Sequence, residues 1–354
     1  MDFDSKNTIL AFILIISVII FTQTDSYLKL VDPEAFQRKQ ERMAQSINEQ
    51  LTPSAQQKEE EPTINPETIP EDEFIQRDST PLPPFLKSIE SNQKGKSESI
   101  IKVETPLYQA ILSTRGGNII QWNLKKYMGP DSEFVNLFTP DSYGNFSLSF
   151  RTVNGDSIST SEYIFDTNQA GKILVEDKNT ISFKLDLGNG KSIEKHYTFN
   201  NKTYSVDYNI GFHGLDQIIA DKRYYISAPN GLASTEKRVK EDMQYAKAAV
   251  YANENIEDGY KTNDKIYKET GQIEWTAVRT KYFAVYIVPK NQTSEAVIIK
   301  GDEQEITAQD AKLKKYSITM TMPYLGTRET KPSFMLYLGP LEYDTLKKYG
   351  NGFE

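Results

Sequence analysis

The feature that most constrains the fold of this chain is a long series of short segments in which apolar and polar residues alternate. In one of them, Ile193, Lys195 and Tyr197 would project from one side of an extended strand. Glu194 and His196 would project from the other side. Alternation with a period of two is the pattern of a β-strand with one face toward a core. Helical patterning is weak between the segments, so the sequence predicts a mainly β protein.

Turn residues separate these alternating segments. The predicted strands cover residues 100–105, 108–114, 119–124, 145–152, 172–176, 180–187, 191–199, 204–212, 224–228, 273–278, 282–288, 296–300, 316–323 and 331–338. Asn189-Gly190 lies between two of them and is a strong hairpin signal. Residues 236–251 have a helical pattern, which an exposed loop could equally explain. So many strands do not fit one sheet, and a large antiparallel sandwich of two sheets fits better.

The charge and the rare residue types argue against several classes of function. The chain has a formal net charge of -8, whereas nucleic-acid binding relies on clustered lysine and arginine. It has no cysteine, which excludes disulfides and thiolate metal sites. The chain has only two histidines, His196 and His213, so few side chains could serve as ligands of a zinc site or as the base of a histidine-based triad. We therefore expect no catalytic residues, no metal, no cofactor and no nucleic-acid partner.

The N-terminus contains a hydrophobic run that predicts a membrane anchor. Thirteen residues from Ile9 onward carry no charge and would span roughly 20 Å as a helix, which polar neighbours can extend toward the ~30 Å of a bilayer core. We predict a transmembrane helix over residues 9–22, preceded by a cytoplasmic segment of residues 1–8. A cleaved signal peptide is the alternative. It is disfavoured because Asp2 and Asp4 outnumber the one lysine before the run, and no small-residue cleavage site follows it.

Residues 23–99 have the composition of a tether. A helix with only a thin apolar stripe is predicted from Pro33 to about residue 51. Residues 52–99 are rich in proline, glutamate, serine and glutamine, and such a segment buries too little apolar surface to offset its ordering entropy. We predict that it is disordered, with a root-mean-square reach of roughly 35–45 Å.

Residues 339–354 predict the start of a truncated amphipathic helix. Leu341, Tyr343, Leu346 and Tyr349 can form its apolar side. We assign these four residues to a membrane-interface helix. The alternative is a terminal helix packed on the sandwich. A helix that begins so close to the last residue also predicts that the chain is the front part of a longer protein.

Four stretches, in this order, resemble the YidC family of bacterial membrane protein insertases. They are residues 4–9, residues 104–119 with Arg115-Gly116-Gly117-Asn118, residues 271–284 with Trp275 and Lys281-Tyr282-Phe283, and residues 336–346 with Leu336-Tyr337-Leu338-Gly339-Pro340. The second stretch also has a structural explanation, because paired glycines permit a tight turn. In the third stretch we expect Trp275, Tyr282 and Phe283 to be core aromatics.

The resemblance implies an insertase and chaperone that inserts, folds and assembles integral membrane proteins, alone or with the Sec translocon. It implies a β-supersandwich of galactose-mutarotase-like shape over residues 100–338, in a protein of the bacterial inner membrane with residues 23–354 in the periplasm. The implied partners are nascent integral membrane proteins, the Sec translocon and the lipid bilayer. In the family, five further transmembrane helices follow the linker helix, which would make the full-length protein multi-pass.

Two other functions stay open on the residues alone. One is a membrane-anchored carbohydrate-binding or mutarotase-like module, because sugar epimerases of this shape use histidines and a carboxylate as acid and base. We expect His196 among exposed strand residues and His213 in a turn, with no matched pair near them, so catalysis is not expected. The other is a scaffold that holds translocon partners.

Overall fold

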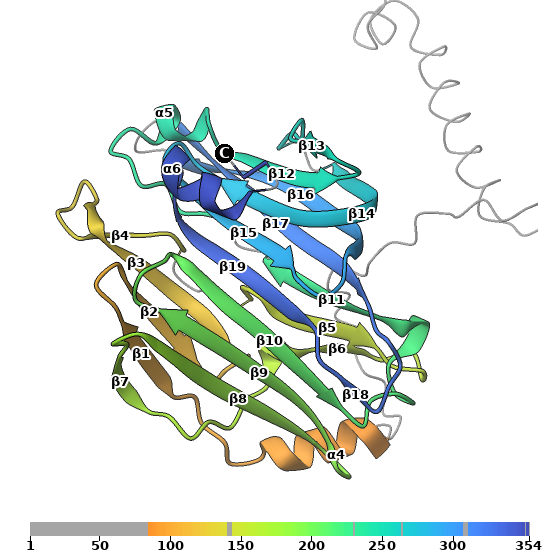
Figure 1. Ribbon diagram of the computed structural model, residues 1–354. Helices are drawn as coiled ribbons and strands as arrows, with labels where there is room; N and C mark the ends of the chain where they lie inside the picture. Colours follow the sequence, from red (N-terminus) through yellow and green to blue (C-terminus); the bar gives the residue numbers. More distant parts are fainter. Residues whose placement is uncertain are drawn as a thin grey trace, which may run out of the picture. The chain divides into compact units, whose positions relative to one another are not determined.

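The computed structural model describes residues 84–139, 144–228, 231–262, 265–306, 311–350 and 352–353 (Figure 1). The predicted cytoplasmic segment, the anchor of residues 9–22 and most of the predicted tether lie outside these residues. Within the described part of the chain, no helix is long and apolar enough to cross a membrane.

The smaller of two β-sheets has five strands in the order β4-β3-β2-β1-β7. Its strands are β1 (Ile100–Glu104), β2 (Tyr108–Ser113), β3 (Asn118–Met128), β4 (Phe134–Asn136) and β7 (Gly171–Leu174). Neighbours pair antiparallel except β1 and β7, which run parallel. Buried and half-buried residues alternate along the first part of β2, as predicted. The buried apolar side chains of this strand belong to the hydrophobic core.

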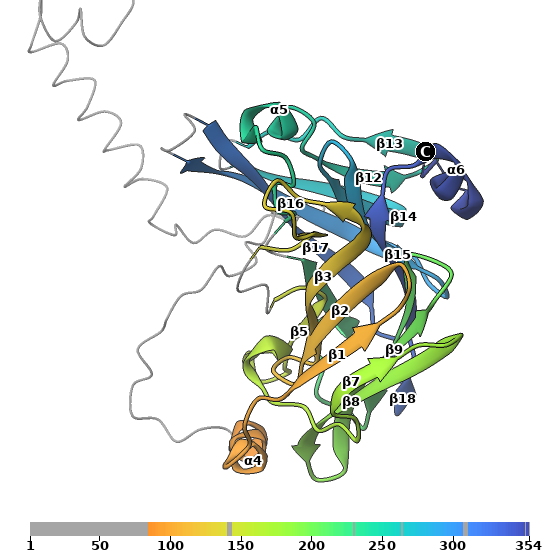
Figure 2. The same ribbon diagram turned by 90° about the vertical axis from the view of Figure 1, so that its left-hand side faces the viewer.

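The larger sheet has fourteen strands and curls strongly (Figures 1 and 2). Its main path is β6 (Ser157–Ser159), β5 (Ser147–Arg151), β11 (Arg223–Ala228), β17 (Ala311–Pro323), β16 (Ser294–Ile306), β14 (Ile266–Arg279), β15 (Phe283–Pro289), β19 (Ser333–Pro340), β10 (Ser205–His213), β9 (Lys191–Asn200) and β8 (Lys178–Gly188). The strands off this path are β12 (Lys247–Ala252), β13 (Asn255–Glu257) and β18 (Glu329–Thr330). The predicted mainly β fold with two sheets is confirmed.

Aromatic side chains fill the core where the two sheets meet. Trp122 of β3 stacks on Tyr108 of β2, with ring centroids 4.0 Å apart, and lies 6.4 Å from Phe199 of β9. The Tyr108 hydroxyl donates to the carbonyl oxygen of Asn200 at 3.0 Å. Rings of this size supply much of the buried apolar area of a core, and here they join the smaller sheet to β9.

The described helices are short. They are α4 (Pro84–Gln93), α5 (Val239–Met243), α6 (Tyr343–Leu346) and the 3-10 turns η1 (Thr160–Glu162), η2 (Ala220–Lys222) and η4 (Lys347–Tyr349). α5 and β12 occupy the stretch for which a helix or an exposed loop was predicted. The strand forms there because Ala248, Val250 and Ala252 alternate and bury their side chains, while β12 pairs with β14.

α4 corrects one prediction about the tether. Its ten residues were expected to be disordered, yet they form a helix that packs on β8. Leu86 and Ile89, three residues apart and therefore on one helical face, are both buried. The Ser88 hydroxyl lies 2.7 Å from the carbonyl oxygen of Leu187. Burying one apolar face on the sheet stabilises a helix that its composition alone would not favour.

Candidate functional site

The four residues assigned to a membrane-interface helix do not share one environment. Leu346 is 3% exposed and Tyr343 is 59% exposed. Leu341 and Tyr349 are half-buried and pack against the core. Tyr349 lies with its ring centroid 5.3 Å from that of Tyr337 in β19. The structure therefore packs most of this apolar side on the sandwich and turns only Tyr343 to solvent, and the membrane role of the four residues stays a prediction.

Phe353 holds the C-terminal segment in place. Its side chain is 3% exposed and stacks on Tyr286 of β15, with ring centroids 4.3 Å apart. The Tyr286 hydroxyl donates to the carbonyl oxygen of Phe353 at 3.0 Å. Trp275 lies edge-on, 5.6 Å away. Trp275 is thus a core aromatic, as predicted, and it helps to form the pocket that receives Phe353.

A cavity of about 370 Å³ opens beside the start of α6. Residues of β3, β4, the segment before α5, the β14–β15 turn and the β19–α6 junction line it. The Tyr127 hydroxyl donates a hydrogen bond to the Glu342 carboxylate. Burial and this neighbouring carboxylate raise the pKa of Tyr127. The contact ties the smaller sheet to the C-terminal segment.

Two lysine side chains lie close to tyrosine rings, and one of them, Lys281, lines this cavity. Lys281 Nζ lies 4.7 Å from the ring centroid of Tyr282 and 5.8 Å from that of Tyr245. Lys347 Nζ lies 5.4 Å from the ring centroid of Tyr343. Such distances allow cation–π attraction. Hydrogen bonding to Tyr282 raises the pKa of Lys281, and a lysine ammonium group is charged at neutral pH even without such a shift.

The position of Tyr282 corrects a second prediction. It was expected in the core, but it is 45% exposed, whereas Phe283 is buried as predicted. Tyr282 lies in the tight turn between β14 and β15, where the Thr280 amide donates to the carbonyl oxygen of Phe283 at 2.8 Å. Alternation along a strand ends at such a turn, so the pattern that predicted burial does not reach Tyr282.

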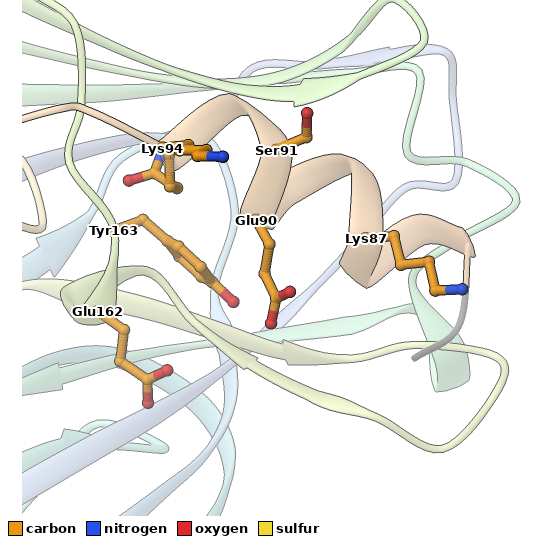
Figure 3. Close-up of a pocket in the computed structure, with 7 residues that line it drawn as sticks. Lys87, Glu90, Ser91, Lys94, Glu162 and Tyr163 are labelled. Atoms are coloured by element: carbon orange, nitrogen blue, oxygen red, sulfur yellow. The ribbon is translucent and has the colours of Figure 1, made fainter. Parts of the chain in front are cut away.

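A second cavity, of about 590 Å³, lies between α4 and η1 (Figure 3). Lys87, Glu90, Lys94, Glu162 and Tyr163 are among its lining residues. Both signs of charge occur there, and this mixture favours no single class of ligand.

The two histidines are closer together than the sequence predicted. His196 Nε2 lies 3.4 Å and His213 Nε2 lies 3.5 Å from the same carboxylate oxygen of Glu194. The expectation of no matched pair near them was wrong, because His196 projects from the same side of β9 as Glu194, and the pairing of β9 with β10 brings His213 to the same carboxylate. His213 is the last residue of β10 rather than a turn residue.

Lys184 on β8 completes this polar cluster. Its Nζ atom lies 3.1 Å from the other carboxylate oxygen of Glu194. Burial alone would raise the pKa of Glu194, but Lys184 and the two histidines outweigh it and lower the pKa. A carboxylate held in its ionised form beside a lysine is a poor general acid. Among the residues that the structure describes, no group of three or more potential ligands is placed to hold a metal ion.

Comparison with known proteins identifies related chains. The family model of the YidC periplasmic domain matches residues 100–354. The membrane protein insertase YidC of Chlorobaculum parvum is 28% identical over 305 residues, which are 82% of this chain and 51% of that protein. The YidC of Chloroherpeton thalassium is 29% identical over 264 residues, which are 73% of this chain and 44% of that protein. The chain thus spans about half the length of these curated relatives.

Solved structures with a similar arrangement of strands are distant. A galactose mutarotase-like protein from Lactobacillus casei matches with a TM-score of 0.43 and 10% identity, over 68% of this chain and 100% of that chain. A likeness of this size says nothing about activity.

Proposed function

Because this chain belongs to the family of the YidC periplasmic domain, we propose that it is the N-terminal part of a membrane protein insertase and chaperone. The observation that carries the proposal is the match over residues 100–354, which takes in every described strand. The relatives' own name, membrane protein insertase, supports it. A mutarotase-like or carbohydrate-binding module is not favoured, because the related chains are insertases.

The proposed action is non-covalent. An insertase lowers the cost of moving polar segments into lipid, where an unsatisfied backbone group is expensive. We propose that residues 1–8 lie in the cytoplasm, residues 9–22 anchor the chain in the bacterial inner membrane, and residues 23–354 lie in the periplasm. The proposed partners are nascent integral membrane proteins, the Sec translocon and the lipid bilayer. The insertase core of the multi-pass protein would lie outside this chain, so residues 100–354 would be an accessory domain.

A chimaera tests this proposal. This chain replaces the matched region of the Chlorobaculum parvum insertase, and insertion of a single-span client protein is measured in cells depleted of their own insertase. We expect the chimaera to support insertion at close to the rate of the parent. A second chimaera carries an unrelated β-sandwich in place of residues 100–354 and controls for mere spacing. The proposal fails if the first chimaera is membrane-inserted and folded but supports no more insertion than depleted cells that carry neither chimaera.

A further inference from the structure

Exposed apolar side chains gather at one end of the sandwich. The set, called here the tyrosine–lysine face, consists of Met128, Phe134, Tyr245, Tyr282 and Tyr343 with Lys126, Lys281 and Lys347. The five apolar members are between 43% and 59% exposed. Large apolar side chains that stay in contact with water cost free energy, and a cluster of them marks a surface that meets something else.

Contacts link most of these residues to one another, while Tyr343 and Lys347 contact each other on the C-terminal segment. Met128 pairs with Phe134 across β3 and β4. Met128, Lys126 and Tyr282 line the cavity beside α6. Tyr245 and Tyr282 share the ammonium group of Lys281. Figure 1 places α5, α6 and the β3–β4 turn toward the upper part of the domain, and Figure 2 shows that α6 lies on the opposite side of that part from α5.

The scaffold beneath this face is ordered by a buried carboxylate. Asp242 of α5 is fully buried and accepts hydrogen bonds from the Ser234 hydroxyl at 2.8 Å and the Lys281 amide at 3.1 Å. The Leu341 amide donates to the carbonyl oxygen of Tyr282 at 2.7 Å. α5, the β14–β15 turn and the start of the C-terminal segment are thereby fixed to one another, so the exposed rings are presented by a preorganised frame.

The chemistry of the face favours lipid over protein as its partner. Lysine is depleted from the cores of protein–protein interfaces, whereas here lysines stand between the exposed rings. Tyrosine rings with a polar tip, interspersed with lysine, are typical of the headgroup region of a bilayer. The chain as a whole is acidic, with a net charge of -8, and the three lysines of the face stand beside its exposed rings.

Acidic side chains near the tyrosine–lysine face offset part of the positive charge of its lysines. Glu236 lines the cavity, Asp344 is exposed on α6, and Asp131 and Glu133 are exposed in the β3–β4 turn. Glu241 of α5 pairs with Arg238 at 2.7 Å. The carboxylate of Glu342 accepts hydrogen bonds from the hydroxyls of Tyr127 and Thr345 and is directed toward them. The lysines beside the exposed rings are therefore the groups placed to meet anionic headgroups.

We propose that the tyrosine–lysine face contacts the headgroup region of a bilayer that contains anionic lipids. This inference rests on the proposed function in one respect, because only a membrane-tethered domain is held close to a bilayer. It extends the lipid contact from Tyr343 and Lys347 of the predicted interface helix to the β3–β4 turn, the loop after α5 and the β14–β15 turn.

The absence of cysteine from the sequence makes a site-specific test possible. The full chain is reconstituted into vesicles of phosphatidylcholine with or without phosphatidylglycerol. Single variants Met128→Cys, Tyr282→Cys and Leu325→Cys carry a fluorophore, and quenching by headgroup spin-labelled lipid is measured. Leu325 is the control because it is 68% exposed and lies in the loop before β18, which Figures 1 and 2 place away from α6.

We expect roughly threefold more quenching at Met128 and Tyr282 than at Leu325, and a further rise with phosphatidylglycerol. Combining Lys281→Glu and Lys347→Glu should remove the phosphatidylglycerol-dependent part. The matched variant Lys331→Glu, at an exposed lysine beside β18, should leave it unchanged. Circular dichroism checks that each variant is folded.

Equal quenching at all three labelled sites overturns the proposal. Quenching that changes neither with anionic lipid nor with the paired lysine substitutions overturns it as well. A face that binds another protein would give no quenching in these protein-free vesicles and would overturn it in the same way. The chimaera test of insertion does not use this readout, so failure of the lipid contact and failure of the proposed function are distinguishable.

Discussion

The Nζ atom of Lys195 lies 2.6 Å from the Oδ1 atom of Asn118 in the core between the two sheets. The same ammonium or amine group donates to the carbonyl oxygen of Gly116 at 2.8 Å. Lys195 is fully buried on β9, while Gly116 belongs to the turn before β3 and Asn118 is the first residue of β3. Burial lowers the pKa of Lys195 well below its usual value. One buried side chain therefore holds the Arg115-Gly116-Gly117-Asn118 motif against the opposite sheet.

Removing this side chain should lower the free energy of unfolding. We expect Lys195→Met to cost about 1–3 kcal/mol, because two buried acceptors lose their donor, and Lys195→Ala to cost more, because it also leaves a cavity. Urea unfolding measures both. Lys178→Met, at an exposed residue of β8, is the control and should change stability little. A methionine variant as stable as the parent chain would contradict the assigned role.

The same residue predicts a dependence on pH. The folded-state pKa of Lys195 is lowered, so the unfolded chain binds the proton more tightly than the folded chain. Stability should therefore rise with pH from the lowered folded pKa toward the unfolded value of about 10.4. Measurements below about pH 9 avoid tyrosine ionisation. Lys195→Met should flatten the rise, and an unchanged slope would rule out Lys195 as its source.

Alternation along β9 placed Lys195 on the same side as Ile193 and Tyr197, and that part of the prediction was correct. The pattern could not show that a lysine would be buried, because its donors find acceptors on a strand far away in the sequence. The alternation placed Glu194 and His196 on one side of β9, but the approach of His213 to Glu194 was missed for a related reason. Register between strands decides which side chains meet, and a single sequence does not specify it.

The helix α4 was missed although a signal for it is present. Leu86 and Ile89 have helical spacing, but prolines directly before them and the polar composition around them favoured disorder. The strands were predicted well because each one carries its own alternation. The helix depends on a surface of β8 that only the folded domain supplies, so local composition was the weaker guide here.

Glu104 links three strands of the smaller sheet and should contribute stability that acid removes. Lys172 of β7 lies 2.7 Å and Lys125 of β3 lies 3.1 Å from its carboxylate oxygens. Hydrogen bonds from Lys172 and then Lys125 lower the pKa of Glu104 to about 2. A lowered carboxyl pKa gives stability that is present above the unfolded pKa of about 4.3 and is lost as pH falls through about 2.

Glu104→Gln should therefore reduce the free energy of unfolding by about 1 kcal/mol near neutral pH, since solvent screens this half-exposed network. The difference between variant and parent chain should shrink as pH falls toward about 2. Thermal unfolding across that range measures it. Glu176→Gln, at an exposed residue after β7, is the control. A difference that persists unchanged in acid would show that ionisation of Glu104 is not its cause.

The cluster around Glu194 should have no epimerase activity. Its carboxylate is held ionised by Lys184, and its pKa is lowered rather than raised toward neutral pH, which makes it unsuited to be the general acid and a weak general base. Polarimetry with glucose and galactose should show no acceleration of mutarotation by the full chain. If acceleration did occur and was lost in Glu194→Gln and His196→Ala, the mutarotase-like alternative would have to be preferred.

The contact of Phe353 with Tyr286 should keep the whole C-terminal segment folded against the sandwich. Phe353 is buried beyond η4, and the backbone bond from the Leu346 amide to the Glu342 carbonyl oxygen, 2.9 Å long, lies in the segment that it holds down. Phe353→Ala removes a stacked ring and should cost about 2–4 kcal/mol, concentrated in this segment. Opening of a local unit exposes its amides to exchange before the rest of the domain unfolds.

Hydrogen exchange of residues 341–350 measures this effect. We expect exchange there to be at least tenfold faster in Phe353→Ala, with β9 and β10 unchanged, because 1.4 kcal/mol of local destabilisation gives a factor of about ten. Tyr343→Ala, which truncates an exposed ring on the same segment, should leave exchange near that of the parent. Uniformly faster exchange across the sandwich would instead show that Phe353 belongs to the global core, and the C-terminal segment would then be part of one cooperative unit with the strands beneath it.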